Sequence, residues 1–266
     1  MIVHKSHSTG RLTGKTVFID IDGTLTTDTE GPFDDDITAI EKAWQQGVKV
    51  FLCTGRSLIQ IAKVFLEAPW IEGIVAAGGA HVILGEKTLY HNWVPIPLLC
   101  DISALFLSTG TRCNFRADKF TYIVNPNKNI RSDSEKQQIT LKDDFLQKYS
   151  DARVSMLTVD HSMQENERDC LLKDFDMYMQ IPHIDFFIKG EGKANGMQMI
   201  LDALSMDRKD SAAIGDSLND MDIISCSGTG IAVGNACKEL KEQASWISAP
   251  VGEGAVVKAL EYLGFC

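Results

Sequence analysis

The architecture of this chain is set by eight residues near its start, which read Phe18-Ile19-Asp20-Ile21-Asp22-Gly23-Thr24-Leu25. The apolar residues before Asp20 predict a short strand over 15–19, and Gly23 predicts a turn soon after it. Side chains two positions apart on a strand point to the same face, which applies to Asp20 and Asp22. A turn after Asp20 would also bend the backbone at Asp22 back toward the same point. Converging carboxylates repel one another unless a cation lies between them, and Mg²⁺ prefers such oxygen ligands. The alternative interpretation is an acidic turn after an edge strand.

Strands and helices alternate through the first part of the chain. Buried strands are predicted over 48–52 and 74–77, with helices over 34–46 and 58–65. This alternation predicts a parallel sheet wound by helices, in which ligands bind at the carboxyl ends of the strands. Asp20, Thr54 and Gly78 all lie at such ends. The shared location is the first indication that Asp20 and Thr54 act together.

The middle of the chain has a different pattern. It carries a predicted hairpin over 81–90 and several short strands but no long buried ones, and its polar stretch 125–138 predicts a loop. We therefore expect an inserted α+β domain over 82–186 and a core formed by 14–81 together with 187–266. The predicted fold class is α/β, a Rossmann-like doubly wound parallel sheet core with this inserted α+β domain. Residues 1–13 are expected to form a loose N-terminal extension.

The alternating pattern returns after the insert and brings further polar residues to strand ends. Lys193 precedes a predicted helix, and a predicted strand over 211–214 ends in Gly215-Asp216-Ser217-Leu218-Asn219-Asp220. Asp216 and Asp220 are four positions apart at a strand-to-helix turn, so both can reach one point. With Asp20 they would give Mg²⁺ three carboxylates and leave positions for water and phosphate oxygens.

This set of residues suits phosphoryl transfer, in which a protein mainly positions groups and neutralises charge. The Thr54 hydroxyl and the Lys193 ammonium are suitable donors to a phosphoryl group, and Lys193 also offsets the acidic cluster. Asp20 is the candidate nucleophile, which would form an aspartyl-phosphate intermediate. Asp22 is placed to protonate the leaving group and then to take a proton from the attacking water.

Four segments together resemble, in order, the four motifs of the haloacid dehalogenase superfamily: Asp20-Ile21-Asp22-Gly23-Thr24-Leu25, Thr54-Gly55-Arg56, Lys193 before a helix, and Gly215-Asp216-Ser217-Leu218-Asn219-Asp220. The resemblance implies that Asp20 is the nucleophile and Asp22 the general acid and base. It implies phosphate contacts from Thr54, Gly55, Lys193 and Asn219. It implies that the metal is held by Asp20, Asp216 and Asp220 and by the backbone carbonyl of Asp22.

The insert resembles the type IIB cap of the Cof-like branch of this superfamily, which would close over the active site and supply selectivity. The C-terminal segments Ile231-Ala232-Val233-Gly234-Asn235-Ala236 and Gly254-Ala255-Val256 resemble the same branch. One segment departs from the pattern, because Ala77-Gly78-Gly79-Ala80 stands where Cof-like proteins commonly have Asn-Gly-Ala. The contribution of that asparagine side chain is therefore in doubt.

Other acidic and histidine residues have weaker claims to a functional role. The triplet Asp34-Asp35-Asp36 would form a second metal site in one interpretation, but acids favoured at a helix N-terminus are the preferred explanation. His81 or His183 could line a site, although a structural role is preferred for each.

Composition excludes several classes of protein. The chain has 266 residues, 44% of them hydrophobic, and a formal net charge of −10. An acidic chain argues against nucleic acid or an anionic membrane as a partner, because both need a basic face. The seven cysteines form no Cys-x-x-Cys pair, which argues against a zinc site and suits a reducing, cytoplasmic location. No stretch approaches the ~18 apolar residues that cross a membrane.

The sequence therefore predicts a Mg²⁺-dependent phosphatase that hydrolyses a small phosphate monoester, such as a sugar phosphate, a nucleotide or pyridoxal phosphate. A phosphomutase on the same core stays open, as does a non-catalytic phosphosugar-binding protein. The expected oligomeric state is a monomer, and a dimer is the alternative.

Overall fold

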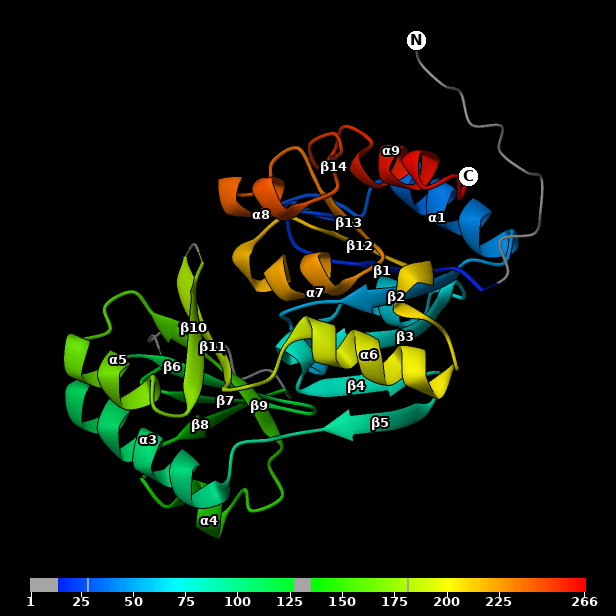
Figure 1. Cartoon of the computed structure of the whole chain (residues 1–266). Helices are drawn as coiled ribbons and strands as arrows, with labels where there is room; N and C mark the ends of the chain where they lie inside the picture. Colours follow the sequence, from blue (N-terminus) through cyan, green and yellow to red (C-terminus); the bar gives the residue numbers. More distant parts are fainter. Residues whose placement is uncertain (1–13, 28, 127–134, 181) are drawn as a thin grey trace. The chain divides into compact units, whose positions relative to one another are not determined.

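The computed structural model describes residues 14–27, 29–126, 135–180 and 182–266, so the predicted extension 1–13 lies outside the described residues. Contacts divide the chain into two compact units (Figure 1). The first comprises residues 1–54, 67–74 and 197–266, and the second comprises 55–66 and 75–196.

The first unit is built on a parallel sheet. Its strands are β1 (Thr16–Ile19), β2 (Lys49–Cys53), β12 (Ser211–Gly215), β13 (Thr229–Ala232) and β14 (Trp246–Ile247). They lie in the order β14-β13-β12-β1-β2, and every neighbouring pair is parallel. Side chains of β1 are fully buried because both faces of a parallel sheet are covered. β1 therefore lies in the middle of the sheet, and the turn after it lies beside the turns after β2 and β12.

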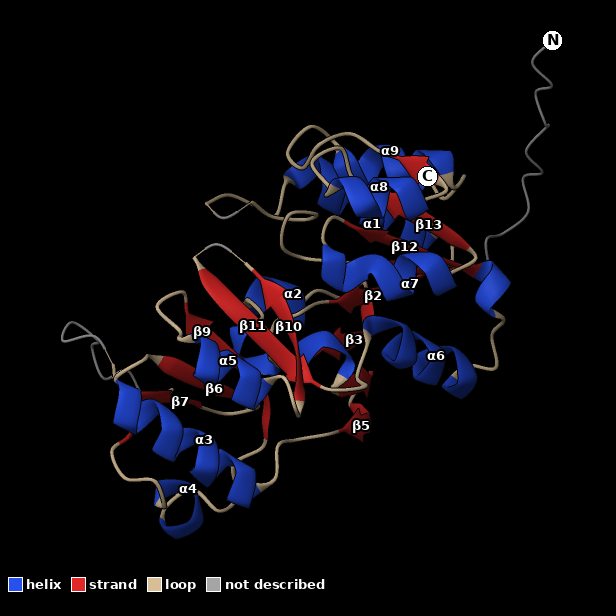
Figure 2. Ribbon diagram, turned by 60° about the vertical axis from the view of Figure 1, so that its left-hand side comes forward, coloured by secondary structure: helices blue, strands red, loops and turns tan. Residues whose placement is uncertain are grey.

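Helices on both faces make this sheet doubly wound. They are α1 (Asp34–Gln45), α7 (Met221–Cys226), α8 (Lys238–Gln243) and α9 (Ala255–Tyr262), with most of α6 (Lys193–Ala203). In Figures 1 and 2, α1 and α9 lie together on one side of the parallel strands, and α7 lies on the other. The predicted α/β fold class is confirmed in this unit.

The second unit contains a six-stranded sheet in the order β10-β11-β9-β6-β7-β8. Its strands are β6 (Cys113–Ala117), β7 (Thr121–Val124), β8 (Lys136–Ile139), β9 (Val154–Asp160), β10 (Phe175–Met179) and β11 (His183–Ile188). All pairs are antiparallel except β7 with β8. Helices α3 (Ile96–Thr109), α4 (Asp144–Gln147) and α5 (Glu165–Leu171) cover the face that carries Phe115, Leu157 and Phe186 (Figure 2).

One further strand and a hairpin lie between β2 and α3 in the described chain. β3 (Ile71–Ala76) begins in the first unit and ends in the second, where β4 (His81–Leu84) and β5 (Lys87–His91) form an antiparallel hairpin. The hairpin predicted near 81–90 is confirmed.

Two local predictions are wrong. The segment 58–65 is not one helix, because a 3₁₀ turn over Leu58–Gln60 is followed by the separate short helix α2 (Lys63–Leu66). The Arg56 guanidinium donates to the Gln60 carbonyl at 3.1 Å, and Ile61 is extended, so the helical ladder stops there. The segment 125–138 is not loop throughout, because its last residues form β8; residues 127–134 of it lie outside the described residues.

In the part of the chain that the structure describes, every helix is too short or too polar to cross a membrane.

Candidate active site

Three predicted carboxylates meet at one edge of the parallel sheet. Asp20 follows β1, and Asp216 and Asp220 follow the neighbouring strand β12; one carboxylate oxygen from each lies within 4.8 Å of the others. Asp20 is 4% exposed and Asp220 is 1% exposed, whereas Asp216 is half-buried. They come together because Ile19 and Ile214 are partners in the register of β1 and β12, so the two strands end side by side.

The turn after Asp20 is held closed by its own backbone. The Ile21 carbonyl accepts hydrogen bonds from the N–H groups of Leu25 at 2.8 Å and Thr26 at 2.9 Å, and the Gly23 N–H donates to the Thr26 carbonyl at 2.7 Å. Asp20 itself donates its N–H to the Ile214 carbonyl at 3.0 Å. Asp22 is exposed on this turn.

Gly23 is required by the close approach of this turn to Asp216. Its φ is +78°, and a Cβ at this position would lie 2.3 Å from the Asp216 Oδ2 atom. Any side chain would therefore displace the Asp216 carboxylate from the cluster, and the left-handed backbone adds strain for a residue other than glycine.

The turn after β12 is fixed by Asp220. Its Oδ2 accepts the N–H groups of Asp216 and Ser217, each at 3.1 Å. The Ser217 hydroxyl donates to the Asn219 Oδ1 at 2.8 Å, which holds Asn219 on the same turn. Asp220 thus orders the loop that carries Asp216 besides adding its own carboxylate to the cluster.

The remaining predicted phosphate contacts are divided between the two units. Thr54 is fully buried directly after β2, the other neighbour of β1 in the sheet. Gly55 is half-buried and begins the second unit. Lys193 is the first residue of α6, belongs to the second unit, and is 1% exposed, which is unusual for a lysine.

The acidic triplet has a structural role. Asp34, Asp35 and Asp36 form the first turn of α1, as the helix-terminus interpretation predicts. Asp36 is fully buried, and its Oδ1 accepts the N–H groups of Val256 and Val257 at 3.0 Å each, so it caps the N-terminus of α9. Burial raises the pKa of Asp36, against the two backbone hydrogen bonds, which lower it.

His81 also fits the structural interpretation. It is 6% exposed, and its ring stacks on that of His91 with the centroids 3.8 Å apart. Burial, with a smaller effect of His91, lowers the pKa of His81 to about 4, so the ring is neutral at physiological pH. His183 is half-buried and its Nε2 lies 3.5 Å from the Asp185 Oδ1.

The segment that departs from the Cof-like pattern has an unusual backbone. Ala77 has a φ of +50° and is 1% exposed, and its N–H donates to the Arg56 carbonyl at 2.7 Å. Asparagine adopts this left-handed region more readily than alanine does. The left-handed backbone at Ala77 is therefore sufficient to explain why Cof-like proteins commonly have asparagine at this position.

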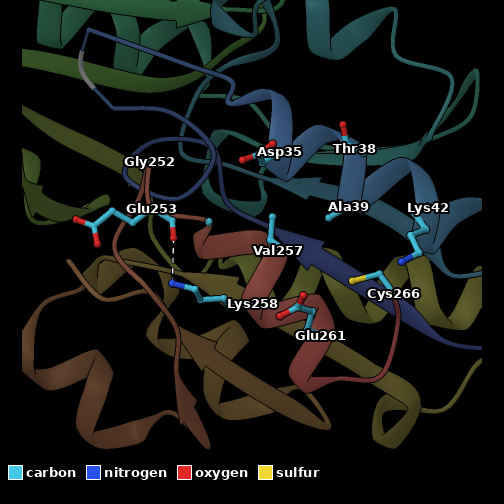
Figure 3. A pocket seen from close by; sticks show the side chains of 11 residues that line it. Asp35, Thr38, Ala39, Lys42, Gly252, Glu253, Val257, Lys258, Glu261 and Cys266 are labelled. Atoms are coloured by element: carbon cyan, nitrogen blue, oxygen red, sulfur yellow. Dashed lines mark hydrogen bonds between the residues drawn. The ribbon is translucent and has the colours of Figure 1, made fainter.

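A cavity of about 640 Å³ lies between α1 and α9 in the first unit (Figure 3). Its described lining carries charges of both signs, among them Asp35, Lys42, Lys258 and Glu261, and includes none of the predicted site residues. Figure 3 also shows the Lys258 ammonium donating to the Glu253 carbonyl, at 3.2 Å. The cavity is separate from the carboxylate cluster.

Asn235 is a residue to which the sequence analysis gave no role. It lies between β13 and α8, and its side-chain amide donates to the Gly23 carbonyl at 2.8 Å. Asn235 lies within segment 231–236, which resembles the Cof-like branch, but the sequence did not indicate its contact with Gly23.

Comparison with known proteins identifies the family. A family model described as haloacid dehalogenase-like hydrolase matches residues 17–260. The chain belongs to this family, and the resemblance drawn from the four motifs is confirmed.

Relatives and solved structures match over nearly the whole chain. The 5-amino-6-(5-phospho-D-ribitylamino)uracil phosphatase YcsE of Bacillus subtilis is 28% identical over 256 residues, covering 93% of this chain and 95% of that protein. Phosphoglycolate phosphatase 1 of Saccharolobus solfataricus is 27% identical over 238 residues, covering 88% and 89%. The structure of the HAD subclass IIB sugar phosphatase BT4131 matches with a TM-score of 0.80 at 25% identity, covering 95% of this chain and 100% of that one.

Proposed function

We propose that this hydrolase is a Mg²⁺-dependent phosphatase that cleaves the phosphate monoester of a small metabolite through an aspartyl-phosphate intermediate. The observation that carries the proposal is the convergence of Asp20, Asp216 and Asp220 within 4.8 Å at the ends of two adjacent parallel strands. The relatives named above are phosphatases of small phosphorylated compounds, which supports the same reaction class.

The donor set of the cluster fits Mg²⁺. It consists of three carboxylates, and hard oxygen ligands of this kind suit Mg²⁺ better than metals that prefer nitrogen or sulfur. The metal would be held by these carboxylates and by the backbone carbonyl of Asp22. When bound, Mg²⁺ would neutralise the negative charge of the cluster and of the substrate phosphate.

Asp20 would act as the nucleophile. One of its carboxylate oxygens forms a bond to phosphorus while the bond from phosphorus to the leaving-group oxygen breaks. Asp22, exposed on the turn two residues further on, donates a proton to the leaving alkoxide. It then takes a proton from the water that attacks the aspartyl-phosphate, which releases inorganic phosphate and restores Asp20.

Four other residues would hold the transferring phosphoryl group. Thr54, Gly55 and Asn219 would contribute hydrogen-bond donors, and the Lys193 ammonium would offset its charge.

The insert 82–186 would act as the cap and select the organic part of the substrate, with sugar phosphates as the leading class. The proposal also includes a monomer in a reducing cytoplasm, in keeping with seven free cysteines.

Phosphate release from a panel of phosphorylated metabolites tests the proposal, with Mg²⁺ or EDTA, for wild type, Asp20→Asn and Asp34→Asn. We expect Mg²⁺-dependent turnover that Asp20→Asn abolishes and that Asp34→Asn, which removes an exposed acid from the first turn of α1, leaves unchanged. Turnover that survives Asp20→Asn would remove Asp20 as nucleophile. Tight binding of one compound without turnover would favour a phosphosugar-binding protein.

A further inference from the structure

Asn235 joins two loops that are far apart in the sequence. Its Nδ2 donates to the Gly23 carbonyl at 2.8 Å, and its Oδ1 accepts the Val251 N–H at 2.7 Å. The first of these bonds spans 212 residues. Both ends of one exposed amide are therefore used, so the side chain has a single orientation with respect to the turn after β1.

The Gly23 carbonyl belongs to the turn that follows Asp20, which hydrogen bonds from Leu25 and Thr26 to the Ile21 carbonyl close. Asp22 precedes Gly23 directly, and Gly23 packs so closely on Asp216 that a Cβ would lie 2.3 Å from the Asp216 Oδ2. A displacement of Gly23 would therefore shift the Asp22 backbone and would also change the contact between Gly23 and the Asp216 carboxylate.

The loop of Asn235 also holds the other side of the cluster. The Cys237 N–H donates to the Asp216 carbonyl at 2.9 Å, and the Val233 N–H donates to the Gly215 carbonyl at 3.0 Å. The loop is anchored in turn, because the Gly234 carbonyl accepts the Lys241 ammonium at 2.6 Å. Residues 233–237 thus contact the loop of Asp216 through backbone and the loop of Asp22 through the Asn235 side chain.

We propose that Asn235 is a positioning residue that fixes the turn of Asp20 and Asp22 relative to the Asp216 carboxylate, and so sets the affinity of the cluster for Mg²⁺. This inference rests on the proposed function. Mg²⁺ tolerates little departure from octahedral geometry, so a small shift between the two loops weakens binding. An exposed side chain contributes little to global stability, so its removal separates the effect on the site from the effect on the fold.

The test is calorimetric titration of Mg²⁺ into the metal-free protein, without substrate, for wild type, Asn235→Ala, Asn235→Asp and Gln198→Ala. We expect both Asn235 variants to bind Mg²⁺ about 10- to 100-fold more weakly, the range seen when groups that orient metal ligands are removed. Asn235→Asp is decisive, because its carboxylate still accepts the Val251 N–H but has no hydrogen to donate to the Gly23 carbonyl. Gln198→Ala removes a surface amide that donates to Asp202 and is the matched control.

Thermal unfolding in EDTA accompanies the titration, and we expect Tm to change by no more than about 3 °C in each variant. If the wild type binds Mg²⁺ and Asn235→Asp binds it with the same affinity, the inference is overturned and the proposed function stays intact. A wild type that binds no Mg²⁺ would overturn both. Weakened binding that tracks a large fall in Tm would show a merely structural role and would also overturn the inference.

Discussion

Gly23 illustrates how a single residue controls the carboxylate cluster. Its missing side chain allows the backbone after Asp22 to lie against the Asp216 carboxylate, and its positive φ closes the turn. Gly23 takes no part in the chemistry: one requirement is steric, and the other is conformational.

Substitution of Gly23 by alanine is therefore expected to reduce kcat/KM by about 100-fold, because a shift of about 1 Å in a catalytic group costs that much. The measurement is steady-state hydrolysis of the best substrate from the panel. Gly14→Ala is the control, since Gly14 has a φ of +91° but no atom within 4 Å of the added Cβ. Equal losses in the two variants would assign the effect to backbone strain and not to the contact with Asp216.

At the scale of elements, buried carboxylates join helices to their surroundings. Asp36 on α1 caps α9, and Asp144 at the start of α4 accepts the N–H groups of Thr140 at 2.7 Å and Leu141 at 2.9 Å. The two groups have pKa shifts of opposite sign, so they respond to pH in opposite directions.

Asp36→Ala should lower the free energy of unfolding by about 2 kcal/mol, because it leaves two buried N–H groups of α9 without a partner. Asp36→Asn keeps a hydrogen-bond acceptor, so its free energy of unfolding should lie within about 1 kcal/mol of the wild-type value. Since burial raises the pKa of Asp36, its contribution to stability is full below the ordinary value of 3.8 and falls as pH rises through the folded value.

Urea unfolding of both variants at several pH values measures this. The stability of wild type relative to Asp36→Asn should fall as pH rises from about 4 to 7. If the stability of wild type relative to Asp36→Asn instead rises with pH, the backbone hydrogen bonds to the charged form of Asp36 outweigh the effect of burial.

Asp144 should show the opposite dependence. Burial alone would raise its pKa, but the Lys148 ammonium and the N–H groups of Thr140 and Leu141 outweigh burial and lower it to about 2. Its contribution is therefore present above the ordinary value of 3.8 and is lost as pH falls toward 2.

The corresponding experiment compares wild type with Asp144→Asn by urea unfolding between pH 3 and 7. We expect Asp144→Asn to be less stable by about 1–2 kcal/mol at neutral pH, with the difference shrinking on acidification. A constant difference across this range would show that hydrogen-bond geometry, and not charge, stabilises the segment.

For the whole molecule, the proposed binding of Mg²⁺ at the carboxylate cluster would be linked to folding. A ligand at 100 times its dissociation constant stabilises the folded state by about 2.7 kcal/mol if it binds only that state. Because the cluster is assembled from strands far apart in sequence, the unfolded chain lacks it. Mg²⁺ should therefore raise Tm of the wild type by several degrees and have a much smaller effect on Asp216→Asn, as measured by calorimetry. An equal rise in both proteins would place the stabilising metal elsewhere.

The oligomeric state is a second prediction at this scale. Exposed large hydrophobic side chains in the described residues are distributed over several elements, for example Val64, Leu146, Met179 and Ile247. We expect light scattering after size-exclusion chromatography to give the monomer mass of 29.4 kDa. A mass twice as large would contradict this expectation.

Local periodicity was sufficient to predict most strands and helices of the parallel sheet and the residues at the ends of its strands. Carboxyl ends of neighbouring parallel strands lie at one edge, so the meeting of Asp20 with Asp216 followed from the pattern alone. The break of segment 58–65 did not, because the hydrogen bond from Arg56 to the Gln60 carbonyl competes with helix formation in a way that apolar spacing does not record.

The tertiary structure alone decided which side chains connect segments that are far apart in the sequence. Asn235 meets Gly23 across 212 residues, and Asp36 meets Val256 across 220. Such bonds depend on where two elements finally pack, and no periodic signal in the sequence carries that information. The residue types needed for the chemistry are therefore readable along the chain, whereas the contacts that hold them in place emerge only when the chain is folded.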